Sequence, residues 1–295
     1  MAGNRDEHRG TAREDGAGDG ADGGTGGGAE LDAEDAAGAL GWEELAPGVL
    51  RCRLPGWDAT VGAVRGASGV LVVDTGSSAG EGARIREGLR GLFGLPVTHV
   101  ALTHDHFDHV FGTAAFDGAE MYGAEGLGAH LAGARGELRR DAVRHGMDAA
   151  TAAESAALLV PPRHGVRGRC ALTPGAGAGS GTRADAGANV RLVAMGAAHS
   201  GFDLAVVVTA PAGSGGAEGG TGTGRRVVFC GDLVEESGEP QAGPDAEPSR
   251  WPAALDRLLA LGGEDARYVP GHGAVVGADF VRAQRDVLAR RFARS

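Results

Sequence analysis

The sequence predicts an α+β fold in which helices and strands pack as layers, and two observations support this class. Short valine-rich runs, each ended by glycine or proline, are typical of strands joined by turns. These runs occur in two batches, and each batch is followed by segments with helical periodicity. Because strands and helices bury one face each against a neighbouring layer, this order predicts layered α and β structure.

The first batch begins the folded part of the chain. Strands are expected in VLRCRL (49–54), ATVGAVRG (59–66), GVLVVDTG (69–76) and VTHVALTH (97–104). Residues 78–94 place Ile85, Leu89 and Leu92 near helical spacing, with Ser77 or Ser78 as the N-cap. Residues 124–159 are rich in alanine, leucine, arginine and glutamate and contain no proline, which predicts about two further helices.

The second batch follows the same order. Strands are expected in VRLVAMGAAH (190–199), DLAVVVTA (203–210), RRVVFCGD (225–232) and ARYVPGHG (266–273). Amphipathic helices are expected at 252–262 and 279–292. Two glycine-rich stretches, 174–189 and 211–224, interrupt this batch and are interpreted as surface loops between neighbouring strands.

The first forty residues differ from the rest of the chain. They hold ten acidic residues against three arginines, together with much glycine and alanine and almost no large apolar side chains. Such a segment cannot bury enough surface to offset the entropy of ordering. Residues 1–40 are therefore expected to form a disordered tail that precedes a single domain, residues 41–295.

Composition narrows the class of protein. The net charge of −11 disfavours a nucleic-acid partner, which would require a basic face. No run reaches the roughly eighteen apolar residues of a membrane span, and the chain does not open on a secretory signal. We therefore expect a cytoplasmic protein without a membrane partner. Three widely spaced cysteines without a CxxC pair argue against a disulfide framework and against a thiolate zinc site.

Potential metal ligands follow the apolar runs. Each of five runs leads into an aspartate or a histidine where the chain turns through small residues. If these strand ends lie along one edge, five separate segments meet at one place, and such loops on rigid scaffolds are where active sites tend to be built. The residues concerned are Asp74, His104, His199, Asp232 and His272.

The segment ALTHDHFDHVFG (101–112) places three histidines and two aspartates within six consecutive positions. In an extended chain the side chains of residues i and i+2 point the same way, so His104 and His106 can reach one metal ion together. Asp108 and His109 follow as the chain turns and can face a second ion, while Phe107 points into the core. A polar turn with chance histidines is the alternative, and it leaves the later junctions unexplained.

The string THDHFDH resembles the HxHxDH signature of the metallo-β-lactamase-fold hydrolase superfamily. The remaining elements appear in that family's order: Asp74 in VVDTG, His199 in AAHSGFDLAV, Asp232 in FCGDLV and His272 in VPGHG. The resemblance spans residues 47 to 280. It implies a four-layer αβ/βα sandwich with metals at one edge of the two sheets.

The resemblance also implies a role for each candidate. The first metal would take His104, His106 and His199, and the second would take Asp108, His109 and His272, with Asp232 bridging both. Asp108 is also the candidate catalytic residue. Asp74 would support the hexapeptide loop from the interior without binding a metal, and Asp105, at the variable position, would face solvent.

Seven candidate ligands are too many for one zinc ion, which is usually four-coordinate and keeps a position open in catalytic sites. Two divalent ions are therefore expected. Zinc is the favoured metal, and iron or manganese is compatible with the same nitrogen and oxygen ligands. Such a pair would share a bridging water and lower its pKa to about 7. The predicted activity is hydrolysis by a metal-bridging hydroxide.

The fold does not determine the substrate. We expect a small-molecule ester, thioester, lactone, amide or phosphodiester. The chain has no lysine, and Cys230 lies two residues before Asp232. Both facts disfavour the branch of true β-lactamases that carries a cysteine ligand and a substrate-binding lysine. His164 and Tyr122 are candidate substrate-binding residues. The pocket walls are expected from residues 113–189 and from the segment after Asp232.

Two alternatives from other classes stay open. Some relatives of this fold bind iron and oxidise sulfur compounds, so the first alternative is an iron-dependent oxidoreductase. A complete second ligand set argues against its single-iron version. The second alternative is a non-catalytic binding protein on the same fold. Such proteins usually lose ligands, and no ligand position is missing in this chain.

Overall fold

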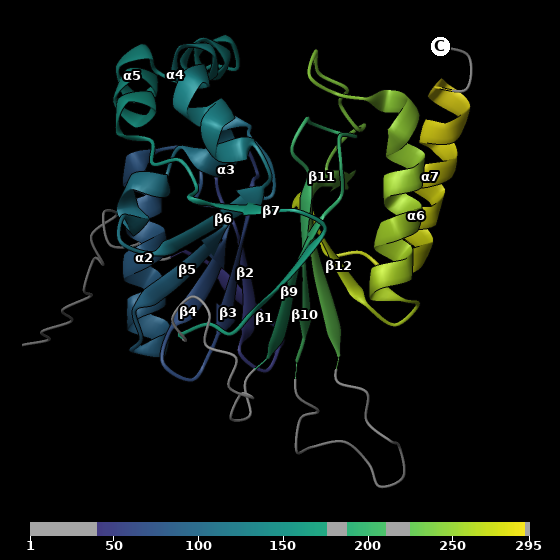
Figure 1. The fold of residues 1–295 in the computed structure, drawn as a ribbon, viewed down its shortest axis with the longest axis horizontal. Helices are drawn as coiled ribbons and strands as arrows, with labels where there is room; N and C mark the ends of the chain where they lie inside the picture. The colour runs from purple at the N-terminus through teal and green to yellow at the C-terminus, as the bar shows by residue number, and fades with distance from the viewer. Residues whose placement is uncertain (1–39, 176–187, 211–224, 293–295) are drawn as a thin grey trace, which may run out of the picture.

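The computed structural model describes residues 40–175, 188–210 and 225–292. Two β-sheets lie face to face, and helices cover the outer side of each (Figure 1). The predicted disordered tail lies outside the described residues except for its last residue. The two predicted glycine-rich loops also lie outside them, apart from the ends of the first.

The first sheet contains seven strands in sequence order: β1 (Trp42–Ala46), β2 (Val49–Arg53), β3 (Thr60–Arg65), β4 (Val70–Val73), β5 (Val97–Ala101), β6 (Glu120–Ala124) and β7 (His164–Val166). Strands β1 to β4 pair antiparallel, whereas β4 to β7 pair parallel. Parallel neighbours need long crossovers. These are α2 (Ala79–Phe93), then α3 (Phe107–Val110) with the 3-10 turn η1 (Thr113–Phe116), then α4 (Leu127–Arg144) with α5 (Ala149–Leu158).

The second sheet has the order β12-β11-β10-β9-β8. Its strands are β8 (Arg169–Leu172), β9 (Asn189–Ala194), β10 (Leu204–Thr209), β11 (Arg226–Glu235) and β12 (Arg267–His272). Strands β8 to β11 pair antiparallel, and β11 pairs parallel with β12. The crossover between the parallel pair contains the 3-10 turn η2 (Pro248–Arg250) and α6 (Trp251–Gly262), and α7 (Ala278–Phe292) follows β12.

The alternation of side chains along the central strands builds the layers. In β4, Val70 and Val72 pack in the core that also contains Ile85 of α2, whereas Leu71 and Val73 face the second sheet. Because successive side chains of a strand point to opposite faces, a strand that is apolar at every position is buried on both sides. Strand β10 follows the same rule toward α6 and α7. The predicted four-layer αβ/βα sandwich is therefore confirmed.

The predicted helices are present with small shifts at their ends. Of the two candidate N-caps for α2, the structure selects Ser78, whose hydroxyl accepts a hydrogen bond from the N–H of Glu81. The predicted helical region 124–159 divides into α4 and α5, and Asp148 caps the second helix by accepting from two backbone N–H groups.

Four strands were not predicted: β1, β6, β7 and β8. They have three to five residues each, and their side chains include charged and small residues that do not alternate with apolar ones. Their pairing with a neighbouring strand, and not a local pattern, makes them strands. Within β11 the structure also corrects an expectation: the predicted strand stops at Asp232, whereas β11 continues to Glu235.

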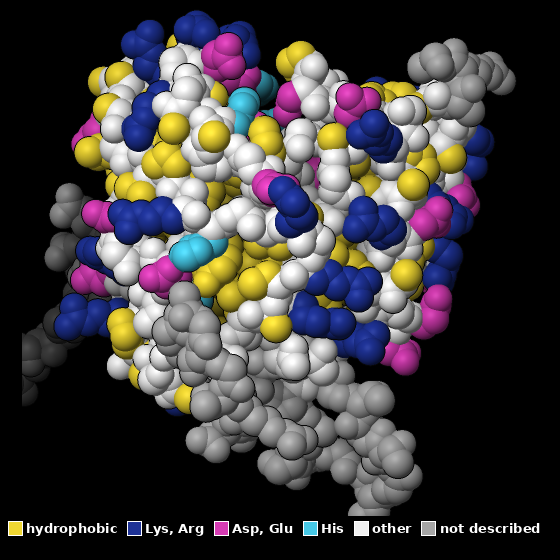
Figure 2. Space-filling model, viewed as in Figure 1, with side chains coloured by type: hydrophobic (Ala, Val, Ile, Leu, Met, Phe, Trp, Pro, Cys, Tyr) yellow, Lys and Arg dark blue, Asp and Glu magenta, His cyan; other side chains and the backbone are white. Residues whose placement is uncertain are grey.

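The outer surface carries charges of both signs. On the face in Figure 2, arginine side chains and carboxylates are interspersed over the helices at both sides, and apolar side chains are visible between them. Among the described residues, no helix combines the length and the apolar character that crossing a bilayer would need.

Candidate metal centre

The hexapeptide segment is positioned by the end of β5 and the short helix α3. His106 is the N-cap of α3 and has an extended backbone, whereas Asp108 and His109 lie within the helix. Phe107 is buried and packs edge-on against Trp57, with ring centroids 5.5 Å apart, as expected for the residue that points into the core. Thr75 holds the turn, because its N–H and its hydroxyl both donate to the carbonyl of His109.

Asp74 supports this segment from beneath. It is buried, and its carboxylate accepts hydrogen bonds from the N–H of Thr103 (2.8 Å) and the hydroxyl of Thr103 (2.8 Å). The third partner is Nδ1 of His109, at 3.0 Å. Since the hydroxyl of Thr103 donates to Asp74, it accepts from Nδ1 of His104, which lies 2.9 Å away. Both imidazoles therefore carry a proton on Nδ1, and the lone pair on Nε2 of each is free to bind a cation.

His106 has two distinct neighbours. Its Nδ1 lies 3.1 Å from Nε2 of His199, and its Nε2 lies 3.1 Å from a carboxylate oxygen of Asp245. Burial disfavours a charge on this ring, but the hydrogen bond that the ring donates to Asp245, together with the nearby carboxylates of Asp232 and Asp105, outweighs burial and raises the pKa of His106 to about 9. Asp245 comes from the segment after β11 and was not identified from the sequence, where QAGPDAEP shows no pattern of a ligand or a support.

His199 is held by the turn between β9 and β10. The buried carboxylate of Asp203 accepts hydrogen bonds from the backbone N–H groups of Ala198, His199 and Ser200. Burial lowers the pKa of His199 to about 3, so its ring is neutral, as a metal ligand must be. Asp203 was not predicted, although an aspartate four residues after a candidate ligand is a signal for such a turn.

Asp232 and His272 come from the parallel pair β11 and β12. Nδ1 of His272 donates to the backbone carbonyl of Trp57 at 2.8 Å, which directs Nε2 toward the pocket. That Nε2 lies 3.3 Å from Asp232 Oδ2 and 3.3 Å from Asp108 Oδ2. Gly271 allows this arrangement, because a Cβ at that position would lie 1.8 Å from Asp232 Oδ1.

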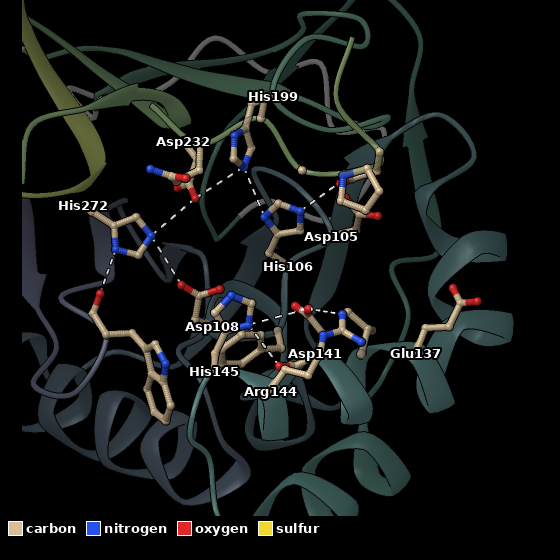
Figure 3. Close-up of a pocket in the computed structure, with 18 of the residues that line it drawn as sticks. Asp105, His106, Asp108, Glu137, Asp141, Arg144, His145, His199, Asp232 and His272 are labelled. Atoms are coloured by element: carbon tan, nitrogen blue, oxygen red, sulfur yellow. Dashed lines mark hydrogen bonds and ion pairs between the residues drawn. The ribbon is translucent and has the colours of Figure 1, made fainter. Parts of the chain in front are cut away.

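The structure brings all seven candidate ligands together, and Figure 3 shows His106, Asp108, His199, Asp232 and His272 directed toward a common centre. They form two groups in which the potential ligand atoms lie within 4.8 Å of one another. One group contains His104, His106, His199 and Asp232, and the other contains Asp108, His109 and His272. Asp232 also lies 3.2 Å from His109, so it adjoins both groups.

The potential ligand atoms are arranged to contact bound cations and not to form hydrogen bonds with one another. His104 Nε2 and Asp232 Oδ1 are buried and have no hydrogen-bond partner among the described residues. An unpaired buried polar atom costs about 1–3 kcal/mol, so such atoms usually have a partner. His104 Nε2 lies 3.4 Å from Asp232 Oδ2, which is close enough for one cation to contact both atoms. Divalent cations would provide the missing partner for both atoms.

The pKa shifts of His272 and Asp232 also indicate that cations would bind in this centre. Burial disfavours a charge on His272, but the carboxylates of Asp232 and Asp108 outweigh burial and raise the pKa of His272 to about 12. Burial likewise disfavours a charge on Asp232, yet the imidazoles of His109 and His104 hold its pKa well below the usual range. The buried carboxylates therefore draw positive charge into the centre, and cations would supply it.

A pocket of about 940 Å³ opens over this centre. Its walls come from α4, which contributes His130, Leu138 and Arg144, and from residues 237–245. Both regions were expected from the sequence to line the pocket. Figure 3 shows Asp141, Arg144 and His145 below His106 in the view, with Glu137 farther to the right.

Three expectations need correction or find no support. Asp105 was expected to face solvent, but it is buried and lies 2.9 Å from Nε2 of His130, because α4 covers that side of the loop. His164 was a candidate substrate-binding residue, but it lies on β7 opposite Tyr122 of β6, and the two rings stack with their centroids 4.6 Å apart. His164 also contacts Glu120, and neither His164 nor Tyr122 is among the residues that line the pocket.

Comparison with known proteins identifies the family of the chain. The family model of the metallo-beta-lactamase superfamily matches residues 54–272. Among solved structures, the chain is similar to the metallo-β-lactamase FIM-1 from Pseudomonas aeruginosa in its mono-zinc form, with 19% sequence identity and a TM-score of 0.55. That match covers 85% of this chain and 95% of the other. The chain belongs to the metallo-β-lactamase superfamily.

Proposed function

We propose that this protein is a metal-dependent hydrolase that acts on a small molecule and holds two divalent cations, with zinc as the favoured metal. The observation that carries the proposal is the convergence of seven nitrogen and oxygen ligand atoms in two adjoining groups, some of them buried without a hydrogen-bond partner among the residues that the structure describes. The family match supports a metallo-hydrolase type of function. The mono-zinc form of the similar β-lactamase supports zinc as the first cation to test.

In this proposal the two groups hold one cation each. The first takes the three histidines His104, His106 and His199, and the second takes Asp108, His109 and His272. Asp232 contributes to both because it lies between them, 3.5 Å from His199 Nε2 and 3.3 Å from His272 Nε2. Zinc suits this mixture of imidazole and carboxylate ligands.

When bound, two such cations would acidify water and polarise the bond under attack. The residues of this chain would orient the reaction. Asp74 and the carbonyl of Trp57 hold the rings of His109 and His272 so that Nε2 of each faces the pocket. Both imidazole contacts of Asp108 use Oδ2, which leaves Oδ1 as the atom proposed to accept the proton of the attacking water.

The pocket accounts for the choice of a small molecule as substrate. Pockets of about 300–1,000 Å³ are typical for small ligands, and this one has about 940 Å³. Trp57 and Leu138 offer apolar surface in it, and Arg140 and Arg144 offer positive charge at its α4 side. We propose an ester, thioester, lactone, amide or phosphodiester as the reacting bond.

The test joins elemental analysis of the purified full-length protein to a panel of ester, thioester, lactone, phosphodiester and β-lactam substrates. Asp232→Ala is expected to lose two-cation occupancy and hydrolysis while the circular dichroism spectrum stays that of the wild type. Asp256→Ala, which removes a surface partner of Arg285, is the control and should keep both properties. Two cations retained in Asp232→Ala would overturn the proposal.

The same measurements separate the other two activity classes. Purified protein with about one iron per chain and no zinc would identify an oxidoreductase in place of a hydrolase. Protein with two cations that hydrolyses nothing in the panel would identify a binding protein.

A further inference from the structure

A β-bulge in β11 places a further carboxylate at the metal centre. Along β11 and β12, Gly231 is paired with Pro270 and Glu235 is paired with His272. Four steps along β11 therefore correspond to two steps along β12. Gly231 has φ of +52°, and a Cβ there would lie 2.7 Å from the hydroxyl of Thr103, so glycine is required where the irregularity begins.

The bulge changes which way the side chains point. In a regular strand, residues i and i+3 lie on opposite faces, so Asp232 and Glu235 would point apart. Here the two intervening residues, Leu233 and Val234, are both buried in the core beneath α6 and α7. Asp232 and Glu235 both line the pocket. Bulges next to active sites commonly re-aim a side chain in this way.

The backbone of the bulge is held in place. The side chain of Gln284, from α7, accepts a hydrogen bond from the N–H of Glu235 and donates one to the carbonyl of Leu233. Trp251 donates to the same carbonyl at 2.9 Å. The N–H of Glu236 donates to the carbonyl of His272. Glu235 is therefore presented by a rigid element, as a ligand should be.

The donor set that results differs between the two groups. Potential ligand atoms of Asp232, Glu235 and His272 lie within 4.8 Å of one another, as do those of Asp108, His109 and His272. Around His272 the centre thus offers three carboxylates and two imidazoles, whereas the other group offers three imidazoles and one carboxylate. Asp232 Oδ1, which is buried and has no hydrogen-bond partner in the described part of the chain, is the second observation that points to a cation here.

We propose that Glu235 is an additional ligand at the second cation position and shifts its preference from zinc toward a harder cation such as Mn²⁺. This inference rests on the proposed function, because it requires that cations occupy the centre. Zinc is usually satisfied by four ligands of mixed nitrogen and oxygen. Carboxylate oxygens suit Mn²⁺ better than they suit zinc, and Mn²⁺ accepts up to six ligands.

The experiment titrates metal-free, full-length protein with Mn²⁺ and separately with Zn²⁺, using calorimetry and the electron paramagnetic resonance signal of bound Mn²⁺. The variants are Glu235→Gln, which keeps the shape and removes the charge, and Glu235→Asp, which withdraws the carboxylate by one methylene. Glu239→Gln is the matched control, because Glu239 is an exposed carboxylate in the same pocket outside the cluster.

The wild type is expected to bind two Mn²⁺ ions. In Glu235→Gln and Glu235→Asp, one of the two should bind about 10-fold or more weakly, with a smaller change for Zn²⁺, while Glu239→Gln matches the wild type. Unchanged Mn²⁺ binding in both Glu235 variants would overturn the inference and leave the proposed function intact. Equal losses for Mn²⁺ and Zn²⁺, or an equal loss in Glu239→Gln, would also overturn it. A wild type that binds neither cation would refute the proposed function as well.

Discussion

Replacing Asp74 with asparagine tests whether this buried carboxylate sets the protonation of the histidines above it. Asp74 Oδ2 accepts from the hydroxyl of Thr103 and from Nδ1 of His109, while Oδ1 accepts from the N–H of Thr103. Asparagine keeps the shape but turns one of the two oxygens into an amide donor. Whichever way the amide lies, at least one buried donor loses its acceptor.

The magnitude follows from that count. Leaving one buried donor unpaired costs about 1–3 kcal/mol of the free energy of unfolding in the metal-free protein. If His109 instead moves its proton to Nε2, the atom that faces His272 is no longer free to bind a cation. Loss of such a supporting partner typically lowers metal affinity about 10–100-fold. With metal in excess, each tenfold loss removes a further ~1.4 kcal/mol of stability.

The assay is chemical denaturation of Asp74→Asn with and without excess Zn²⁺, together with a zinc titration. The variant should be destabilised in both conditions, and more strongly with zinc present. Glu81→Gln is the control, because Glu81 is a buried carboxylate that accepts from the N–H and hydroxyl of Ser77 and contacts none of the histidines that the structure describes. Its effect should be equal in both conditions. Equal destabilisation of Asp74→Asn with and without zinc would refute the reasoning.

Two further predictions follow from close packing and from burial. Gly271→Ala should displace the Asp232 carboxylate, which lies 1.8 Å from the added Cβ, and elemental analysis should find at least one cation lost; Gly277→Ala, whose Cβ would meet nothing within 4 Å, should keep both. Burial raises the pKa of the Cys52 thiol from 9.0 to about 11, so its contribution to stability is complete below pH 9 and is lost as the pH rises to 11. Urea unfolding should therefore show a steeper fall for the wild type than for Cys52→Ala between pH 8 and 11, by at most about 3 kcal/mol. Parallel curves for the two proteins would contradict the assignment of that loss to Cys52.

Several features of this protein could be predicted from local sequence because their physical cause is local. The strands β4 and β10 are apolar at nearly every position, and burial on both faces follows from that alone. The spacing of His104 and His106 predicts a shared direction, because side chains alternate along an extended chain. Phe107, placed between them and Asp108, was expected in the core and is buried there.

Other features could not be predicted because they depend on contacts between distant segments. Asp105 is buried only because α4 brings His130 to within 2.9 Å of it. Asp245 reaches His106 across 139 positions of the chain, from a segment without any regular pattern. His164 becomes a strand residue through its pairing with β6, and this pairing stacks it on Tyr122 outside the pocket lining.

The sequence by itself determined the fold class and the candidate donors, since hydrophobic alternation and the chemistry of histidine and aspartate are properties of short segments. Only the tertiary structure decided how those donors divide into two groups and which carboxylates join them. Glu235 shows the reason most clearly. Its direction depends on the register between β11 and β12, and two strands acquire a register only when the chain between them has folded.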